Sequence, residues 1–293
     1  MFVNNEMDGV IKVLNNKANV SFIHSLGVSA IHVFESILTM DKTTFAKTIE
    51  SLKISSQIAD NLRHKSYTSF IFTPDYNNYT DQECHAELCY AKSLLLWGLI
   101  TVLADQSIYG VINGGLKIRA SHQSYKECSN ILKLRNNWES SSCRMHFESG
   151  TRLGIGAFEL FVSLFPTKMA KLLEFVGFSS NRELALRELN TSVGLIDGIL
   201  YDVTSILLSV YHGFLEYFYG LGEGNFDFFN RSSKIWLSRT PNSAIVKIGL
   251  GIAQKITGNI NQAIEHYTQC IQTEKYWTQL HFTCYWEMAW CYA

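Results

Sequence analysis

A two-residue motif recurs at a spacing of 34 residues in the last third of the chain, and it constrains the fold more than any other feature. Gly224-Asn225 and Gly258-Asn259 stand at the same point of two segments with helical periodicity. A fixed period of this length indicates a repeated unit that buries its apolar face against its neighbours. Only three prolines interrupt the 293 residues, which suits long helices better than many short strands. The sequence therefore predicts an all-α fold.

The second copy follows the pattern of the tetratricopeptide repeat, a pair of antiparallel helices with a period of about 34 residues. Leu250-Gly251 fill the Leu-Gly step of the first helix, and Ala263 and Tyr267 fill the small-then-aromatic step of the second. Gly251 and Ala263 stand where the two helices touch, so a larger side chain would separate them. Pro241 ends the first copy where the pattern has its proline. We expect antiparallel helix pairs stacked as a tetratricopeptide-type repeat array.

The match departs from the pattern at a few positions. Lys247 and Gln254 replace the usual aromatic residues, and Phe229 replaces the small residue of the first copy. Because polar residues stand at Lys247 and Gln254 in place of packing residues, these two are the candidate protein-binding residues. A buried ion or a neighbouring helix would explain them equally well.

Helix start signals also occur outside the repeats. Thr80 with Glu83, and Ser180 with Glu183, have the spacing of a capping box, in which each residue satisfies a backbone N–H of the other. A weaker third helix pair is predicted on the two sides of residue 41, with Ala46 as its small contact residue.

Composition shifts divide the chain into predicted parts. Residues 66–80 are polar, aromatic and broken by Pro74, which indicates a linker. The predicted organisation is an N-terminal helical region with a weak repeat at 1–65, the linker at 66–80, a central helical region at 81–209, and two repeats plus a final helix at 210–293.

The charge pattern limits the classes of partner. A formal charge of -1 argues against binding nucleic acid. Basic residues line the predicted helix over 109–137, where they form a solvated face or contact an acidic partner: Lys117, Arg119, Lys126, Lys133 and Arg135. No basic region followed by an apolar run opens the sequence, so we expect a cytoplasmic protein whose seven cysteines are reduced and mostly buried.

The stretch "HFESGTRLGIGAFELFVSLFP" at 146–166 has three possible interpretations. Its glycines lack the preceding strand and the Gly-Lys-Ser/Thr ending of a phosphate-binding loop. Its apolar run is interrupted by Glu159 before it reaches the length of about 20 residues needed to cross a membrane. We therefore expect no transmembrane segment, and we interpret Gly150 and Gly154 as contact points for a neighbouring helix. Peripheral membrane or lipid contact through 153–178 remains the alternative.

No set of residues predicts a reaction centre. Cys84, His85 and Cys89 lack the tight pairs of a zinc site, which favours core cysteines. His212 and Glu216 are four residues apart and are expected to form an ion pair, because no motif places a nucleophile beside them. We expect no catalytic residues, no metal and no cofactor.

Four blocks of the sequence resemble a known family. They are "GGLKIRASHQSYKEC" at 114–128, "HFESGTRLGIGAFELFVSLFPTKMAKLLEFVGFSSNRELALREL" at 146–189, "GEGN" at 222–225 and "HFTCYWEMAWC" at 281–291. These blocks are similar to the tetratricopeptide repeat protein 39 family, which is related to the fungal inclusion body clearance proteins. The resemblance implies an all-helical repeat protein that binds other proteins, and it carries no catalytic residues. Some relatives are associated with lipid metabolism or lipid droplets.

The resemblance also bears on the end of the chain. Relatives continue into further repeats, whereas this sequence stops at Ala293 within a helix predicted to begin near Thr278. We expect that helix to expose an apolar stripe made of Phe282, Tyr285, Met288 and Ala289. The predicted function is a non-catalytic helical-repeat scaffold or adaptor for partner proteins.

Overall fold

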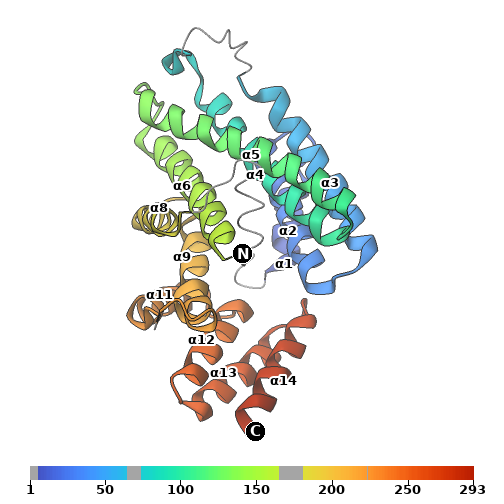
Figure 1. The fold of residues 1–293 in the computed structure, drawn as a ribbon, viewed down its shortest axis with the longest axis vertical. Coiled ribbons are helices and arrows are strands. Elements are labelled where there is room, and N and C mark those ends of the chain that lie inside the picture. The colour runs from blue at the N-terminus through green and yellow to red at the C-terminus, as the bar shows by residue number, and fades with distance from the viewer. Residues whose placement is uncertain (1–5, 65–73, 165–180, 223) are drawn as a thin grey trace. The chain divides into compact units, whose positions relative to one another are not determined.

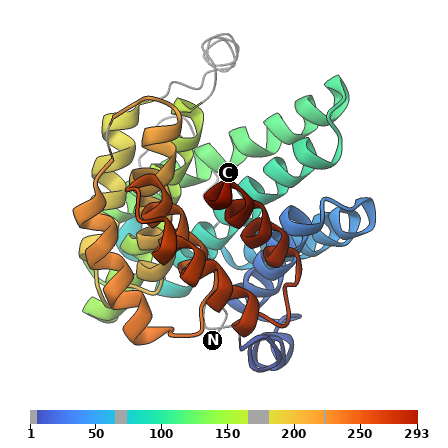
Figure 2. The same ribbon diagram turned by 90° about the horizontal axis from the view of Figure 1, so that it is seen from below.

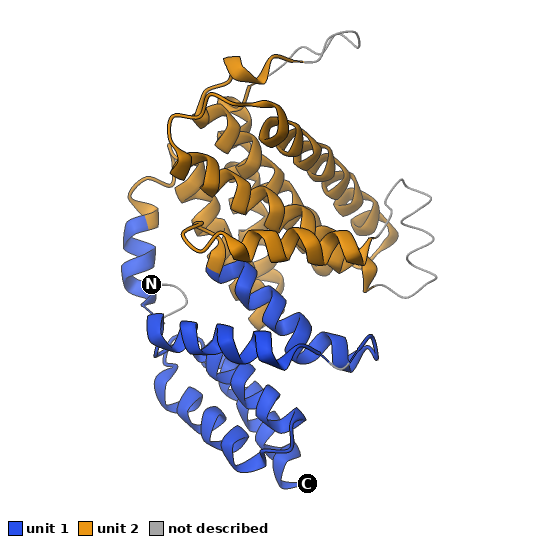
Figure 3. Ribbon diagram, turned by 90° about the vertical axis from the view of Figure 1, so that its left-hand side faces the viewer, with its two compact units in different colours: residues 1–13, 202–293 blue, residues 14–201 orange. Residues whose placement is uncertain are grey.

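Helices make up all the regular secondary structure in the described part of the chain. The computed structural model describes residues 6–64, 74–164, 181–222 and 224–293, and no strand occurs in these ranges (Figure 1). Two compact units are present, unit 1 with residues 1–13 and 202–293 and unit 2 with residues 14–201 (Figure 3). The prediction of an all-α fold is confirmed.

The helices of each unit follow one another along the chain. Unit 2 contains α2 (Phe22–Thr39), α3 (Lys42–Leu62), a 3-10 turn (Tyr76–Asn78), α4 (Asp81–Ala104), α5 (Ile108–Leu134), α6 (Ser141–Ser163) and α8 (Arg182–Gly194). Unit 1 contains α9 (Tyr201–Val210), a π-turn (Tyr211–Leu215), α10 (Glu216–Phe218), α11 (Phe226–Arg239), α12 (Ala244–Ile256), α13 (Ile260–Thr273) and α14 (Gln279–Tyr292). Helix α1 (Met7–Asn15) spans the first boundary between the units, and α9 begins at the last residue of unit 2.

The helix starts show which predicted caps form. Thr80 and Glu83 make the predicted capping box of α4, with the Thr80 backbone N–H donating to Glu83 Oε2 at 2.7 Å. Helix α8 instead begins after Asn181, whose side-chain oxygen accepts from the Leu184 N–H at 2.9 Å. The prediction that Ser180 caps this helix is wrong, because the Asn181 amide already occupies the N-cap position; Ser180 lies outside the described residues.

Close packing in unit 2 depends on glycines. Helices α4 and α5 approach at Gly98 and Gly114, where a Cβ atom on either residue would lie 2.7 Å from the other's carbonyl oxygen. In α6, a Cβ at Gly154 would overlap the Tyr125 ring of α5, and Cβ atoms at Gly150 and Gly156 would meet side chains of α4 and α8 at 2.6 and 2.7 Å. The interpretation of these α6 glycines as packing positions is confirmed, and each faces a different neighbour.

The weak repeat near the N-terminus forms a helix pair, α2 and α3, with Asp41 as the N-cap of α3. Ala46 is exposed, so its predicted role as the small contact residue is wrong. Buried hydroxyls lie between the two helices instead: Ser36 Oγ and Thr48 Oγ1 are 2.7 Å apart, and both residues are fully buried. Short hydroxyl side chains allow close approach while satisfying each other's hydrogen bonds.

The repeat in unit 1 recurs in the structure as well as in the sequence. Helices α11 and α13 begin at Phe226 and Ile260 and end at Arg239 and Thr273, so both ends recur after 34 residues. Gly224 and Gly258, which precede them, have φ angles of 82° and 83°. Glycine adopts this left-handed conformation without steric cost, which explains why both turns carry it. Helix α12 packs on α13 and α13 on α14 (Figure 2, orange to red).

Three predicted boundaries, after residues 65, 80 and 209, stay predictions. Residues 66–73 of the predicted linker lie outside the described residues. The part that is described contains Asp75, which caps the 3-10 turn through the Asn77 N–H at 3.1 Å.

Candidate protein-binding site

The repeat positions predicted from the sequence gather at the contact between α12 and α13. Ala263 and Tyr267 are fully buried and Leu250 is nearly so. A Cβ atom at Gly251 would lie within 2.8 Å of three ring atoms of Tyr267, so the glycine makes room for the aromatic ring. Pro241 lies two residues beyond the end of α11 and is exposed. Leu250, Gly251, Ala263 and Tyr267 hold the helix pair together and offer little surface to a partner.

The two turn asparagines act differently. Asn225 caps α11, with its side-chain oxygen accepting from the Phe228 N–H at 3.0 Å. Asn259 makes no such cap, and its amide donates instead to Gln254 Oε1 at 2.9 Å and to Thr257 Oγ1 at 3.2 Å.

Lys247 and Gln254, the candidate protein-binding residues, have internal partners in unit 1. Lys247 is only 6% exposed, and its ammonium donates to Thr273 Oγ1 at 3.0 Å. Burial lowers the pKa of Lys247. Gln254 is half-buried and accepts the Asn259 hydrogen bond. A protein-binding role for Lys247 and Gln254 stays a prediction. A second candidate binding surface lies in unit 2.

That surface is a groove of about 620 Å³ in unit 2, formed by α5, α6 and α8. It exists because α5 packs along α4 and α6 along α8, whereas α5 and α6 touch over a shorter length. The lining comprises His122, Tyr125, Lys126, Ser129, Leu132, Lys133, Arg144, Glu148, Thr151, Arg152, Ile155, Phe158, Glu159, Leu184, Arg187 and Glu188. We call it the α5/α6/α8 groove.

Ion pairs fix the centre of the α5/α6/α8 groove. The Arg152 guanidinium contacts Glu148 one turn earlier in α6 at 2.7 Å and Glu188 of α8 at 2.8 Å. Glu159 is buried and accepts the Asn181 backbone N–H at 3.0 Å, and burial raises the pKa of its carboxyl group. These contacts tie α6 to α8 and use the carboxylates that line the groove.

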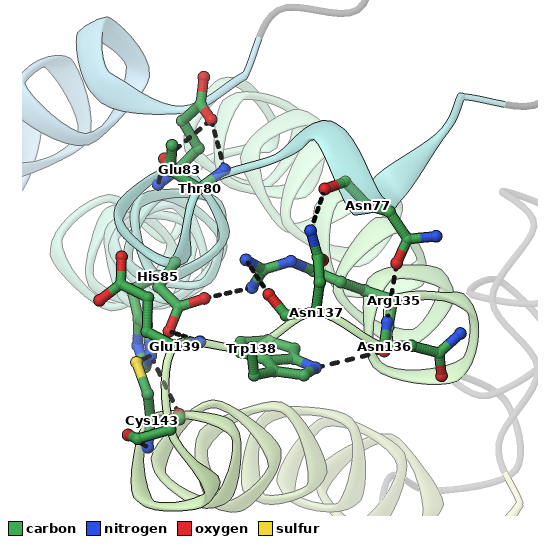
Figure 4. Close-up of polar contacts among 12 residues, drawn as sticks. Asn77, Thr80, Glu83, His85, Arg135, Asn136, Asn137, Trp138, Glu139 and Cys143 are labelled. Atoms are coloured by element: carbon green, nitrogen blue, oxygen red, sulfur yellow. Dashed lines mark hydrogen bonds and ion pairs between the residues drawn. The ribbon is translucent and has the colours of Figure 1, made fainter.

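A buried polar junction lies between the start of α4 and the connection from α5 to α6 (Figure 4). Arg135, which ends α5, contacts Asp81 at the start of α4 at 2.5 Å, and both residues are buried. The guanidinium lies 4.3 Å from the Trp138 ring centre, and the Glu139 N–H donates to Asp81 at 3.2 Å. Burial alone would raise the pKa of Asp81, but hydrogen bonds from Cys143 and Arg135 outweigh it and lower the pKa. The connection from α5 to α6 is therefore anchored to the start of α4.

Sequence reasoning finds only some of the residues of this site. Lys126 and Lys133 line the groove, whereas Arg135 is buried, so the expectation of a solvated basic face is wrong for Arg135. Its burial follows from the carboxylate of Asp81, which a helix pattern does not place. The remaining signal is a stripe of charged residues at steps of four, four and seven along α6, from Arg144 to Glu159.

The other residues considered for metal binding or catalysis take part in packing or in an ion pair. Cys84, Cys89, Cys128, Cys270 and Cys284 are buried, which confirms the prediction of mostly buried cysteines. No group of three or more potential metal ligands occurs within the described ranges. The predicted contact of His212 with Glu216 is confirmed, with 2.8 Å between Nδ1 and Oε2.

Apolar surfaces lie on several helices. By length and composition alone, α2 and α4 could cross a membrane, a test that core helices of soluble proteins also pass; half of the apolar window of α4 is buried. The predicted stripe on α14 is exposed at Phe282, Tyr285 and Ala289 and half-buried at Met288.

Comparisons with known proteins agree with this architecture. The family model described as Iml2/Tetratricopeptide repeat protein 39 matches residues 1–293. Tetratricopeptide repeat protein ttc-39B of Caenorhabditis elegans is 29% identical over 293 residues, which are 98% of this chain and 51% of that protein, so the chain spans about half the length of this relative. No solved structure matches. The match over the full sequence and the 34-residue helix repeat lead to one conclusion: the chain belongs to the Iml2/tetratricopeptide repeat protein 39 family.

Proposed function

We propose that this chain is a non-catalytic helical-repeat scaffold that binds partner proteins in the α5/α6/α8 groove. The groove itself is the observation that supports the proposal: about 620 Å³, with apolar side chains such as Ile155 and Leu184 beside a charged rim. Apolar contacts supply affinity and a few placed polar groups supply orientation in such sites. Helical-repeat proteins commonly use concave surfaces between their helices in this way.

The remaining parts of the proposal rest on the family. The chain spans about half the length of its relative. Any partner or activity of a longer protein therefore belongs to the proposal. A cytoplasmic location is kept as a proposal from the sequence pattern, and a link to lipid metabolism is proposed on the resemblance alone.

The alternative is a peripheral membrane or lipid-associated protein that uses 153–178. Within the described part of that region, Leu153, Phe158, Leu160 and Val162 are buried, and Phe161 is 49% exposed. Few apolar side chains there are available to a lipid surface, which favours the protein-binding proposal; residues 165–178 lie outside the described residues.

A photo-crosslinking residue distinguishes the two proposals. We expect benzoylphenylalanine at Ser129, in the groove, to crosslink to proteins in cytosol, and the same residue at Gln123 to crosslink far less. Gln123 lies on the same helix and is exposed but does not line the groove. Crosslinks from position 129 to lipid alone, or equal protein crosslinking from both positions, would contradict the protein-binding proposal.

A further inference from the structure

We propose that the α5/α6/α8 groove takes an acidic segment of a partner protein, in which carboxylate side chains are interspersed with apolar ones. This inference rests on the proposed function above and specifies the chemistry of the partner.

The lining has more cations than carboxylates, and its carboxylates are already engaged. Five cations and three glutamates line the groove. Glu148 and Glu188 both contact Arg152, and Glu159 is buried against the Asn181 N–H. These internal contacts leave the glutamates little capacity to bind a basic ligand.

Exposed cations surround this engaged centre on all three helices. Lys133 of α5, Arg144 of α6 and Arg187 of α8 are exposed, and none forms an ion pair with any residue in the described ranges. Lys126 is also exposed, and its positive charge partly opposes the burial that raises the pKa of Glu159. The available charge of the rim is therefore positive, which complements an anionic ligand.

The floor of the groove contributes apolar area and one polar group. Ile155, Leu184 and Phe158 line it beside the buried Thr151. Thr151 is 1% exposed, and its hydroxyl has no hydrogen-bond partner among the residues that the structure describes. A buried hydroxyl without a partner costs free energy, and a ligand group that reaches the floor would satisfy it.

The spread of the cations favours a protein segment over a single phosphate or lipid headgroup. Lys126 and Lys133 are seven residues apart in α5, which is about 10 Å along a helix axis. Carboxylates two or three residues apart on an extended segment match this span, whereas one phosphate contacts both cations only if the two side chains converge. The apolar floor between the cations would accept the intervening side chains.

Fluorescence polarisation tests this inference with a labelled peptide of Glu-Asp-Leu-Phe repeated three times. We expect binding that weakens as salt rises from about 50 to about 300 mM, because screening reduces the attraction of exposed charges. The neutral peptide of Gln-Asn-Leu-Phe repeated three times should bind at least about tenfold more weakly. Equal binding of the two peptides would overturn the inference.

Charge reversal locates the binding. The double variant Lys133→Glu/Arg187→Glu should lose about tenfold in affinity, whereas Arg119→Glu should change it by about twofold or less. Arg119 is exposed on the same helix as Lys133 but does not line the groove. Should the double variant unfold, Arg187→Gln alone should still weaken binding about threefold. Equal losses in the groove and control variants would contradict the assignment.

Two further outcomes separate this inference from the proposed function. If the acidic peptide fails to bind while the residue at position 129 still crosslinks to proteins, the scaffold stands and the acidic partner is wrong. If vesicles of equal parts phosphatidylcholine and phosphatidylserine bind through Lys133 and Arg187 and the acidic peptide does not, the ligand is an anionic lipid surface, which overturns the inference.

Discussion

At the scale of single residues, large and small side chains exchange places between the two repeats of unit 1. In the second copy, Gly251 lies against the ring of Tyr267. In the first copy, Phe229 occupies the position of Ala263, and it lies against Gly213, where a Cβ atom would be 2.9 Å from its ring. Gly213 lies in the π-turn. Each large side chain faces a glycine, so the total volume at the contact is conserved despite the departure from the repeat pattern.

Gly251→Ala is expected to destabilise unit 1 by about 1–3 kcal/mol, because the new methyl group would overlap the Tyr267 ring. Gly249→Ala in the same helix is the control, since the nearest atom to its Cβ would be 3.9 Å away. That change should be neutral or stabilise by up to about 1 kcal/mol through helix propensity. Urea unfolding followed by circular dichroism measures both, and equal effects of the two substitutions would refute the packing account.

At the scale of elements, the orientation of α5 and α6 depends on the junction between Arg135 and Asp81. The two residues are 54 positions apart in the sequence and belong to the ends of different helices. A buried ion pair costs desolvation, and the attraction between its charges offsets that cost only with good geometry and additional hydrogen bonds. Removing one partner leaves the other charge buried and unpaired.

Asp81→Asn is therefore expected to destabilise unit 2 by about 3 kcal/mol at pH 7. The lowered pKa of Asp81 adds a pH signature. A carboxyl group whose pKa is lower in the folded state contributes stability above its unfolded pKa of about 4, and that contribution is lost as pH falls through the folded value. The difference in unfolding free energy between wild type and variant should narrow below pH about 4. Urea titrations at several pH values measure it, and a constant difference would argue against this role.

At the scale of the whole molecule, the distribution of apolar surface distinguishes α14 from helices that are covered. Phe282, Trp286 and Trp290 are 76%, 65% and 60% exposed, and the ring centres of the two tryptophans lie 6.0 Å apart. A patch of this kind on a soluble chain promotes association. The sequence predicted the stripe through Phe282 but not the contribution of the tryptophans.

Trp286→Gln/Trp290→Gln is expected to lower the fluorescence of a bound hydrophobic dye and to reduce self-association in light scattering, with helicity unchanged. Thr283→Gln is the matched control, since Thr283 is exposed on the same helix and polar. The expectation fails if the double variant associates as much as the control.

The sequence by itself determined the features that depend on residues close together in the chain or on a regular period. The helices, the 34-residue repeat, the Thr80 cap and the contact of His212 with Glu216 all follow from residues three or four apart, or from a period that recurs. The all-α class followed from these patterns, whereas the family resemblance followed from the four longer sequence blocks.

Tertiary structure decided the candidate site. The α5/α6/α8 groove is lined by side chains from 122–133, 144–159 and 184–188. No local sequence pattern predicts that these three helices leave a groove between them. The same holds for the burial of Lys247 and Arg135, which polar character alone predicts to be exposed. Burial and ion pairing depend on which helix lies opposite, and that is fixed by long-range packing rather than by the periodicity of any one helix.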